Sequence, residues 1–254
     1  MLRTRIIPVL LLKDESLVKT VRFREFTYVG DPANTVRIFN ELEVDELLFL
    51  DISASKEKRG PNLKVLRDIA DECFMPLGYG GGITTLEEAK AVFNIGFEKV
   101  AVNSSSFQNP NLVYEISNHF GNQSVIVSID VKKTLFGRQR VYVLSGKQNT
   151  QHDPVTWAKK VEEMGAGEIL LTSIDHEGTW NGFDIELVKS VADAVSIPVI
   201  AHGGAGTIEH IQNVIKESHA SAVALGSMVV FQKKGMGVLV NFPKVRDLEM
   251  HFNE

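Results

Sequence analysis

The chain has 254 residues, of which 44% are hydrophobic and 23% charged, and its formal net charge is −5 at pH 7. These proportions are those of an ordinary globular protein with a large core, and the mild acidity gives no electrostatic case for binding nucleic acid or an anionic membrane. No apolar run reaches transmembrane length, no signal-peptide cleavage site follows the first residues, and a single cysteine excludes an internal disulfide and a thiolate metal site, so we expect a cytoplasmic protein.

Strand-like and helix-like runs alternate along the chain. The expected strands lie at residues 5–12, 47–52, 75–79, 99–103, 124–131, 168–173, 197–202 and 222–226. Several of them are nearly continuous in valine, isoleucine and leucine, as expected when both faces of a parallel sheet are buried. Eight strand–helix units predict one (β/α)8 TIM barrel spanning residues 1–254, with an open doubly wound sheet as the alternative.

Two long loops interrupt this regularity. Residues 13–31 carry several lysines and arginines among aromatic residues, and residues 132–150 have the pattern of a hairpin that turns at Phe136 and Gly137. Each loop follows the carboxyl end of a strand, which is the end where the loops of a barrel carry function.

Two similar glycine-rich phrases, Gly78–Thr84 and Ala201–Thr207, each follow an apolar run and precede a helix-like pattern that opens with threonine. The unpaired N–H groups of such a helix start can cradle a phosphate, although glycine can also serve only to turn the chain tightly. The repetition predicts two half-barrels, at about 1–121 and 122–254, and a ligand phosphorylated at both ends.

Further polar residues at the strand ends complete the two expected cradles. The candidate substrate- and phosphate-binding residues are Gly82, Asn103 and Ser104 in the first cradle, and Thr172, Gly178, Gly203, Gly204, Gly226 and Ser227 in or near the second. His202 lies in the second glycine phrase, where a hydrogen-bonding role is commoner than a role as a base. The histidines show no metal-ligand spacing, so no metal site is expected.

Asp51 and Asp130 end the second and fifth expected strands, and either could move protons at the barrel mouth or serve a structural role in its loop. The half-repeat aligns Asp130 with Leu11, which cannot exchange a proton. At the other end of the barrel, four charged residues stand at strand starts: Arg5, Glu46, Lys99 and Glu168. They are either solvated strand ends or a ring of alternating charge across the barrel floor.

Nearly the whole chain resembles the cyclase (HisF-type) subunit of imidazole glycerol phosphate synthase. The resemblance is carried by phrases such as Arg5–Pro8, Gly30–Pro32, Phe49–Ile52, Gly80–Ile83 and Gly165–Ser173. It implies the same barrel, no cofactor, and a separate glutaminase subunit that docks on the floor and sends ammonia through the barrel to a two-phosphate substrate.

The resemblance also assigns roles to individual residues. It implies that Arg5, Glu46, Lys99 and Glu168 form the gate to the ammonia passage, that Lys19 lies in a mobile substrate loop, and that Asp130 is one of two catalytic aspartates. The other aspartate is replaced by Leu11. Tyr79 and His202 are bulkier than the usual residues at the mouth, and Glu177 replaces an aspartate.

Loss of one member of an acid/base pair typically costs about 10²–10⁴ in rate, so we expect impaired cyclase activity. The leading hypothesis is a paralogue that keeps the glutaminase partner but serves another phosphorylated acceptor. The resemblance implies a sugar amidated for surface polysaccharides together with an ATP-dependent amidotransferase.

Three alternatives remain open from the sequence. The first is an active cyclase of histidine biosynthesis, which makes imidazole glycerol phosphate and aminoimidazole carboxamide ribotide with Asp130 alone or with help from Asp14. The second is a sugar-phosphate isomerase that works without a glutaminase, and the third is a barrel that only binds a phosphorylated metabolite.

Overall fold

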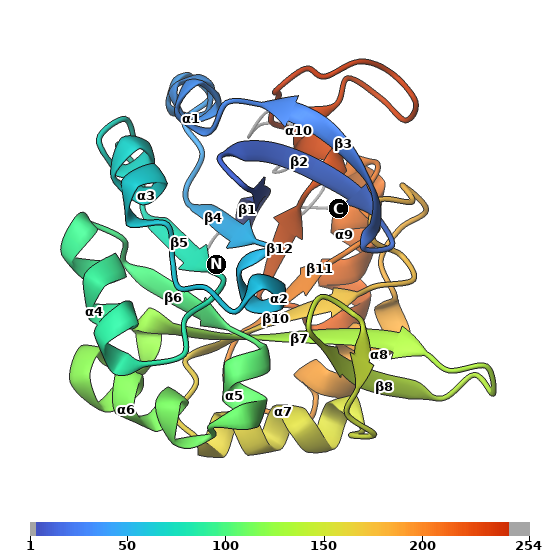
Figure 1. The fold of residues 1–254 in the computed structure, drawn as a ribbon. Coiled ribbons are helices and arrows are strands. Elements are labelled where there is room, and N and C mark those ends of the chain that lie inside the picture. The colour runs from blue at the N-terminus through green and yellow to red at the C-terminus, as the bar shows by residue number, and fades with distance from the viewer. Residues whose placement is uncertain (1–3, 244–254) are drawn as a thin grey trace.

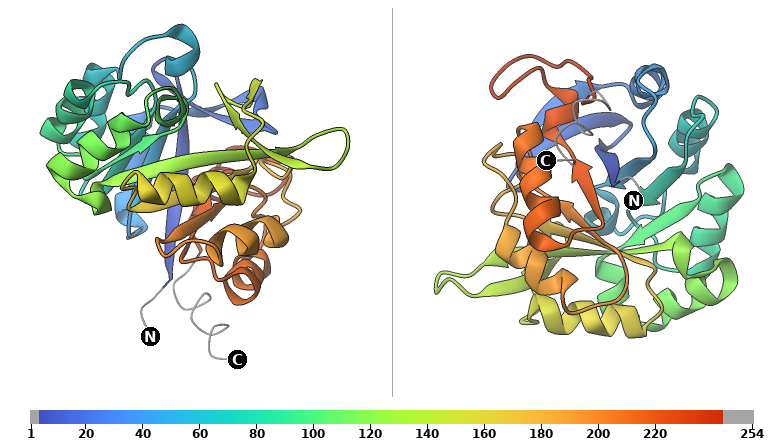
Figure 2. Two further views of the ribbon diagram at one scale, coloured as in Figure 1. Left: turned by 90° about the horizontal axis from the view of Figure 1, so that it is seen from below. Right: turned by 180° about the vertical axis from the view of Figure 1, so that it is seen from behind.

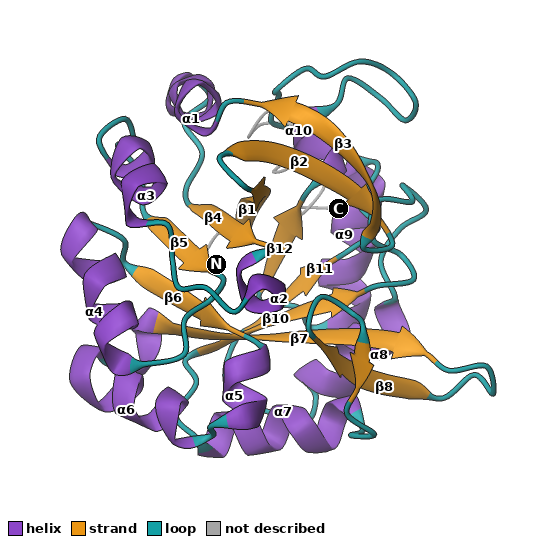
Figure 3. Ribbon diagram, in the orientation of Figure 1, coloured by secondary structure: helices purple, strands orange, loops and turns teal. Residues whose placement is uncertain are grey.

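A computed structural model describes residues 4–243 and shows eight parallel strands closed into a barrel with helices around it (Figure 1, Figure 3). The barrel strands are β1 (Arg5–Lys13), β4 (Leu47–Asp51), β5 (Leu77–Gly80), β6 (Lys99–Val102), β7 (Val125–Lys133), β10 (Glu168–Ser173), β11 (Val199–His202) and β12 (Ala222–Leu225). Each pairs in parallel with the next, β7 pairs with β10, and β12 pairs with β1, which completes the circle. The predicted TIM barrel is therefore confirmed.

The helices form the outer layer. They are α1 (Pro32–Glu41), α2 (Ala54–Glu57), α3 (Leu63–Ala70), α4 (Leu86–Ile95), α5 (Ser104–Gln108), α6 (Asn111–Phe120), the 3-10 turn η1 (Asn122–Ser124), α7 (Pro154–Glu163), α8 (Ile185–Ala192), α9 (Ile208–Ser218) and α10 (Ser227–Val230). Within residues 4–243, none of these helices has the length and apolarity needed to cross a membrane.

Equivalent helices of the two halves begin in the same way. The same sequence interval separates the residues that cap them: Asp31 from Asp153, Asn62 from Asp184, and Thr85 from Thr207. In each case the side-chain oxygen accepts a backbone N–H of the first helical turn, which would otherwise lack a partner. This interval aligns Gly81 with Gly203, whereas the alignment of the two glycine phrases pairs Gly80 with Gly203. The two alignments differ by one residue because Thr85, and not Thr84, caps its helix.

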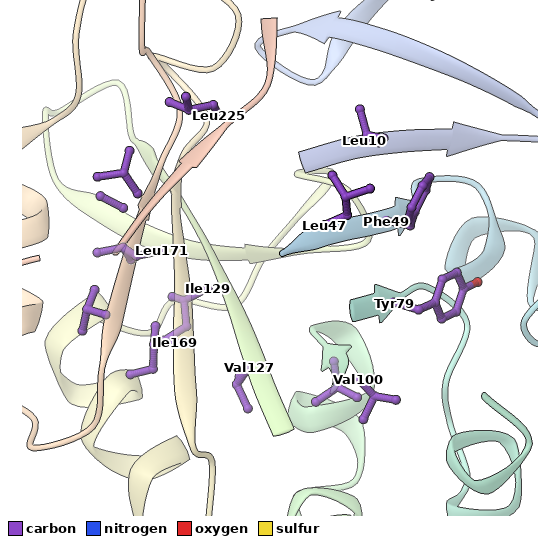
Figure 4. Close-up of a cluster of buried hydrophobic side chains, with 14 of the residues drawn as sticks. Leu10, Leu47, Phe49, Tyr79, Val100, Val127, Ile129, Ile169, Leu171 and Leu225 are labelled. Atoms are coloured by element: carbon purple, nitrogen blue, oxygen red, sulfur yellow. The ribbon is translucent and has the colours of Figure 1, made fainter. Parts of the chain in front are cut away.

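The core has two shells, because successive side chains of a strand point to opposite faces. Leu10 on β1 belongs to the cluster between the strands and the helices, whereas Val9 and Leu11 belong to the cluster inside the barrel. The outer shell includes Tyr79 (Figure 4). The Tyr79 ring meets that of Phe97 edge-on. The expectation that the bulky Tyr79 side chain lies at the barrel mouth is therefore wrong, since the side chain faces the helices.

Two antiparallel excursions leave the barrel at its carboxyl end. Strands β2 (Ser16–Val21) and β3 (Arg24–Gly30) extend from β1, and strands β8 (Gln139–Val143) and β9 (Gln148–Asn149) extend from β7. The β7–β8 hairpin projects beyond the helical layer (Figure 2). Gly137 has φ 76 at its turn, and its N–H donates to the Thr134 carbonyl at 2.9 Å, so the hairpin expected around Phe136 and Gly137 is confirmed.

Candidate functional site

A cavity of about 660 Å³ opens at the carboxyl ends of the strands. Of the residues expected to bind or act there, Gly82, Asn103, Ser104, Asp130 and Thr172 line it, and so do Leu11, Asp51, Glu177 and His202. Four cations also line it: Lys56, Lys58, Arg59 and Lys147. These four were not predicted from the sequence, because Lys56 lies on α2 and the other three lie in loops that only the fold brings to the cavity.

Asp130 lines this cavity and is held there by neutral hydrogen-bond donors. Asn103 Nδ2 donates to its Oδ2 at 3.2 Å, and Ser128 Oγ donates to its Oδ1 at 3.4 Å. Burial raises the pKa of the carboxyl from 3.8 to about 7, with the Ser128 and Thr172 hydroxyls opposing the shift and Glu177 adding to it. A carboxyl with a pKa near neutrality can both take up and release a proton, which suits acid/base chemistry.

In the first half-barrel, Leu11 occupies the position that Asp130 holds in the second half-barrel. Its backbone lies opposite Leu50 on β4, as that of Asp130 lies opposite Thr172 on β10, and both pairs stand at the carboxyl ends of equivalent strands. The strand register agrees with the alignment of Leu11 with Asp130 that the repeat predicts. The Leu11 side chain is 5% exposed among the apolar residues inside the barrel, so this half of the cavity has no acid on β1.

Asp51 has a structural role. Arg59 donates to both of its oxygens, at 2.8 Å and 3.2 Å, and the N–H groups of Ser53 and Ala54 donate to Oδ1 at 3.0 Å each. With four donors directed at it, the carboxylate is fixed as the organiser of the loop that carries α2.

His202 is buried beside Asp130's neighbour Thr172, whose hydroxyl lies 3.0 Å from Nδ1. Burial, together with the nearby charge of Lys19, lowers the pKa of His202 to about 3. The imidazole ring is therefore uncharged at neutral pH. Its contact with Thr172 is a hydrogen-bonding role, which the sequence favoured over a role as a base.

The first expected cradle faces the cavity. Gly82 has φ 70, and a Cβ there would lie 2.3 Å from the Arg59 carbonyl oxygen, so the turn requires glycine. Ser104 Oγ donates to Asn103 Oδ1 at 3.1 Å and accepts the Leu144 N–H at 3.0 Å. The segment between β8 and β9 is thereby tied to this cradle.

The second expected cradle is covered. Gly178, Gly203, Gly204, Gly226 and Ser227 are absent from the cavity lining. A Cβ on Gly178 would lie 2.4 Å from the Thr20 carbonyl oxygen, and one on Gly226 would lie 2.6 Å from Lys19 Nζ. The structure thus differs from the expectation of two open cradles, because the β2–β3 hairpin lies over the second one and Lys19 places its ammonium group against Gly226.

Glu177 fastens this hairpin. Its carboxylate accepts Lys19 Nζ at 3.1 Å, the Thr20 hydroxyl at 3.0 Å and the Phe23 N–H at 3.1 Å, while its carbonyl accepts the Arg22 N–H at 2.9 Å. The sequence showed only that glutamate replaces an aspartate here. The contacts involve residues some 150 positions away, so no local pattern could reveal them.

At the opposite end of the barrel, four charged side chains form a closed ring. Arg5 lies 2.9 Å from Glu46 and 2.8 Å from Glu168, and Lys99 lies 3.1 Å from Glu46 and 3.2 Å from Glu168. Each cation therefore bridges both carboxylates. Of the two alternatives for these strand ends, the structure shows the ring.

Between the ring and the cavity, the inside of the barrel is apolar and includes several small residues. Ala101, Ala222 and Ala224 belong to the inner cluster, and a Cβ on Gly78 or Gly80 would meet neighbouring side chains at 2.8 to 2.9 Å. Among the described residues, no three histidine, cysteine, aspartate or glutamate side chains gather in a group able to hold a metal ion.

Comparison with known proteins is in keeping with this geometry. The family described as "Histidine biosynthesis protein" matches residues 5–234. The chain is 48% identical over 250 residues to "Putative imidazole glycerol phosphate synthase subunit hisF2" of Pseudomonas aeruginosa, covering 98% of this chain and 100% of that protein. It is 42% identical over 250 residues to the imidazole glycerol phosphate synthase subunit HisF of a Hydrogenobaculum species, with 98% and 99% covered.

A third relative, subunit HisF of a Nostoc species, is 41% identical over 245 residues, with 95% of each chain covered. Matches of this extent include both half-barrels, the floor and the mouth. The chain therefore belongs to the histidine biosynthesis protein family, as a member of its HisF-type imidazole glycerol phosphate synthase cyclase subunits.

Proposed function

We propose that this chain is the synthase subunit of a cytoplasmic glutamine amidotransferase complex and receives ammonia from a glutaminase subunit docked on the amino-terminal face of the barrel. The closed ring of Arg5, Glu46, Lys99 and Glu168 supports the proposal, because it stands at the entrance to the barrel. The apolar interior above it suits a small neutral molecule such as ammonia and disfavours ions.

At the mouth, the ammonia meets a phosphorylated acceptor held in the cavity beside Asp130. The observation that carries this part of the proposal is the presence of Leu11 at the position equivalent to Asp130. With one acid/base group in place of two, we propose that cyclase activity is impaired and that the acceptor is a sugar amidated for surface polysaccharides, with an ATP-dependent sugar amidotransferase as a further partner.

The decisive experiment supplies ammonium salt and the phosphoribulosyl-formimino substrate of the cyclase reaction to the purified chain. We expect turnover about 10²–10⁴ lower than that of a HisF subunit with both aspartates. Turnover comparable to that of such a HisF subunit would contradict the proposal that cyclase activity is impaired. Co-purification with a glutaminase and stimulation of glutamine hydrolysis test the proposal of ammonia transfer separately.

One observation favours a second candidate, an active cyclase subunit of histidine biosynthesis. Asp130 retains its Asn103 and Ser128 donors and a pKa of about 7, so one proton-transfer group is ready for use. If that group suffices, the same assay yields imidazole glycerol phosphate and aminoimidazole carboxamide ribotide at an ordinary rate.

A further inference from the structure

The cations that line the cavity are gathered on one side of it. Lys56 lies on α2, Lys58 follows that helix, and Lys147 lies between β8 and β9. None of these three lysines forms an ion pair with any residue in the range 4–243. Arg59, in contrast, is neutralised by Asp51 and Glu57.

This side of the cavity is the side of the first cradle. A Cβ on Gly82 would lie 2.9 Å from the Ala54 Cβ, which places the start of α2 against the glycine turn. The segment that carries Lys147 is fixed to the same place, because the Leu144 N–H donates to Ser104 Oγ at 3.0 Å and Ser145 Oγ donates to the Ile52 carbonyl at 3.1 Å.

Lys56 and Lys147 both line the cavity, and their positive charges interact. Burial lowers the pKa of Lys56, and the charges of Lys147 and Lys13 lower it further, with Glu57 opposing the shift. Like charges facing one cavity repel each other, and an anion placed between them would remove that cost.

The opposite side of the cavity offers no free cation among the described residues. Lys19, the cation nearest to the second cradle, forms an ion pair with Glu177. Both side chains are buried, at 4% and 2% exposure. A second phosphate arriving there would have to displace a carboxylate that already holds three donors. Within residues 4–243, one side of the cavity thus has three lysines without ion pairs against one lining carboxylate without an ion pair, Glu88, which caps the start of α4, and the other side has a closed, neutral pair.

We infer that the ligand carries its negative charge at one end, as a diphosphate group, with one phosphate at the first cradle beside Gly82 and the other between Lys56 and Lys147. The inference rests on the proposed function only in taking this cavity as the acceptor site. It narrows the acceptor from a compound phosphorylated at both ends to one with a diphosphate or an equivalent dianionic extension at a single end.

Calorimetric titration of the purified chain with inorganic pyrophosphate and with inorganic phosphate at low ionic strength tests the inference. We expect one pyrophosphate site, with pyrophosphate bound about tenfold or more tightly than phosphate. Lys56→Ala and Lys147→Ala should each weaken pyrophosphate binding about fivefold, and the double variant should remove most of the preference for pyrophosphate.

Lys64→Ala is the matched control, because Lys64 is an exposed lysine on α3 outside the cavity and its replacement changes the net charge equally. Two equivalent phosphate sites, or equal effects of Lys147→Ala and Lys64→Ala, would overturn the inference. These binding results do not depend on a glutaminase. If the chain stimulates glutamine hydrolysis but does not bind pyrophosphate, the ammonia-transfer proposal stands and only the diphosphate inference is contradicted.

Discussion

Lys19 and Glu177, which are 158 positions apart in the chain, form a buried ion pair at 3.1 Å that holds the β2–β3 hairpin over the second glycine cradle. Because Thr20 and Phe23 donate to the same carboxylate, this one side chain holds three residues of the hairpin. The pair therefore couples the loop after the first barrel strand to the loop after β10.

We expect Glu177→Ala to free this hairpin. Breaking a buried ion pair by removing one partner typically costs about 3–5 kcal/mol, because the other charge is left buried and unpaired. Trypsin should then cleave after the exposed Arg22 and Arg24 on the order of tenfold faster or more, as followed by mass spectrometry of the native protein. Glu15→Ala, an exposed change of the same charge in the turn before β2, is the control, and equal cleavage of both variants would contradict the role of Glu177.

Leu11→Asp should restore the missing acid. The new carboxyl would lie among Val18, Leu50 and other apolar residues of the inner cluster, so the free energy of unfolding should fall by about 1–3 kcal/mol. Turnover with ammonium salt and the cyclase substrate should rise by up to about 10². Leu11→Asn separates acidity from polarity, and an equal rise with asparagine, or none with either, would mean that the acid at this position does not limit the reaction.

Lys99→Ala should uncouple glutamine hydrolysis from ammonia use in the complex with a glutaminase. The change leaves Glu46 and Glu168 with Arg5 alone, so the ring is open on one side. Glutamate release should continue while product formed per glutamine hydrolysed falls, measured in a coupled assay with excess glutamine. Lys90→Ala, on the outer surface of α4, is the control, and an unchanged product ratio for Lys99→Ala would falsify the gate.

Asp130 makes folding stability depend on pH. Its pKa is about 7 in the folded protein against an ordinary 3.8, so the folded state keeps a proton that the unfolded state loses. Stability is therefore fully present below about pH 4 and declines as the pH rises through about 7. Asp130→Asn, which resembles the protonated acid, should raise the melting temperature much more at pH 8 than at pH 5, and a pH-independent difference would contradict the raised pKa.

The barrel could be predicted from the sequence because its signals are local. Apolar runs mark the strands, and a capping residue such as Thr85 or Thr207 marks a helix start. The alignment of Leu11 with Asp130 followed from the repeat and agrees with the strand register.

The covered second cradle could not be predicted, because it depends on contacts between distant loops. The side-chain direction of Tyr79 was missed for another reason: in a strand buried on both faces, composition does not show which residues point inward. Asp51 was ambiguous until Arg59, eight residues away in a loop, was placed beside it.

The floor ring has one more property. Every one of its four charged groups has two partners, so breaking any single contact leaves each group with one partner still in place. Opening the ring at one point thus costs one contact between a partly exposed cation and a buried carboxylate, and it never leaves a buried charge without a partner. Such redundancy allows repeated opening and reclosing without loss of the floor's overall neutrality.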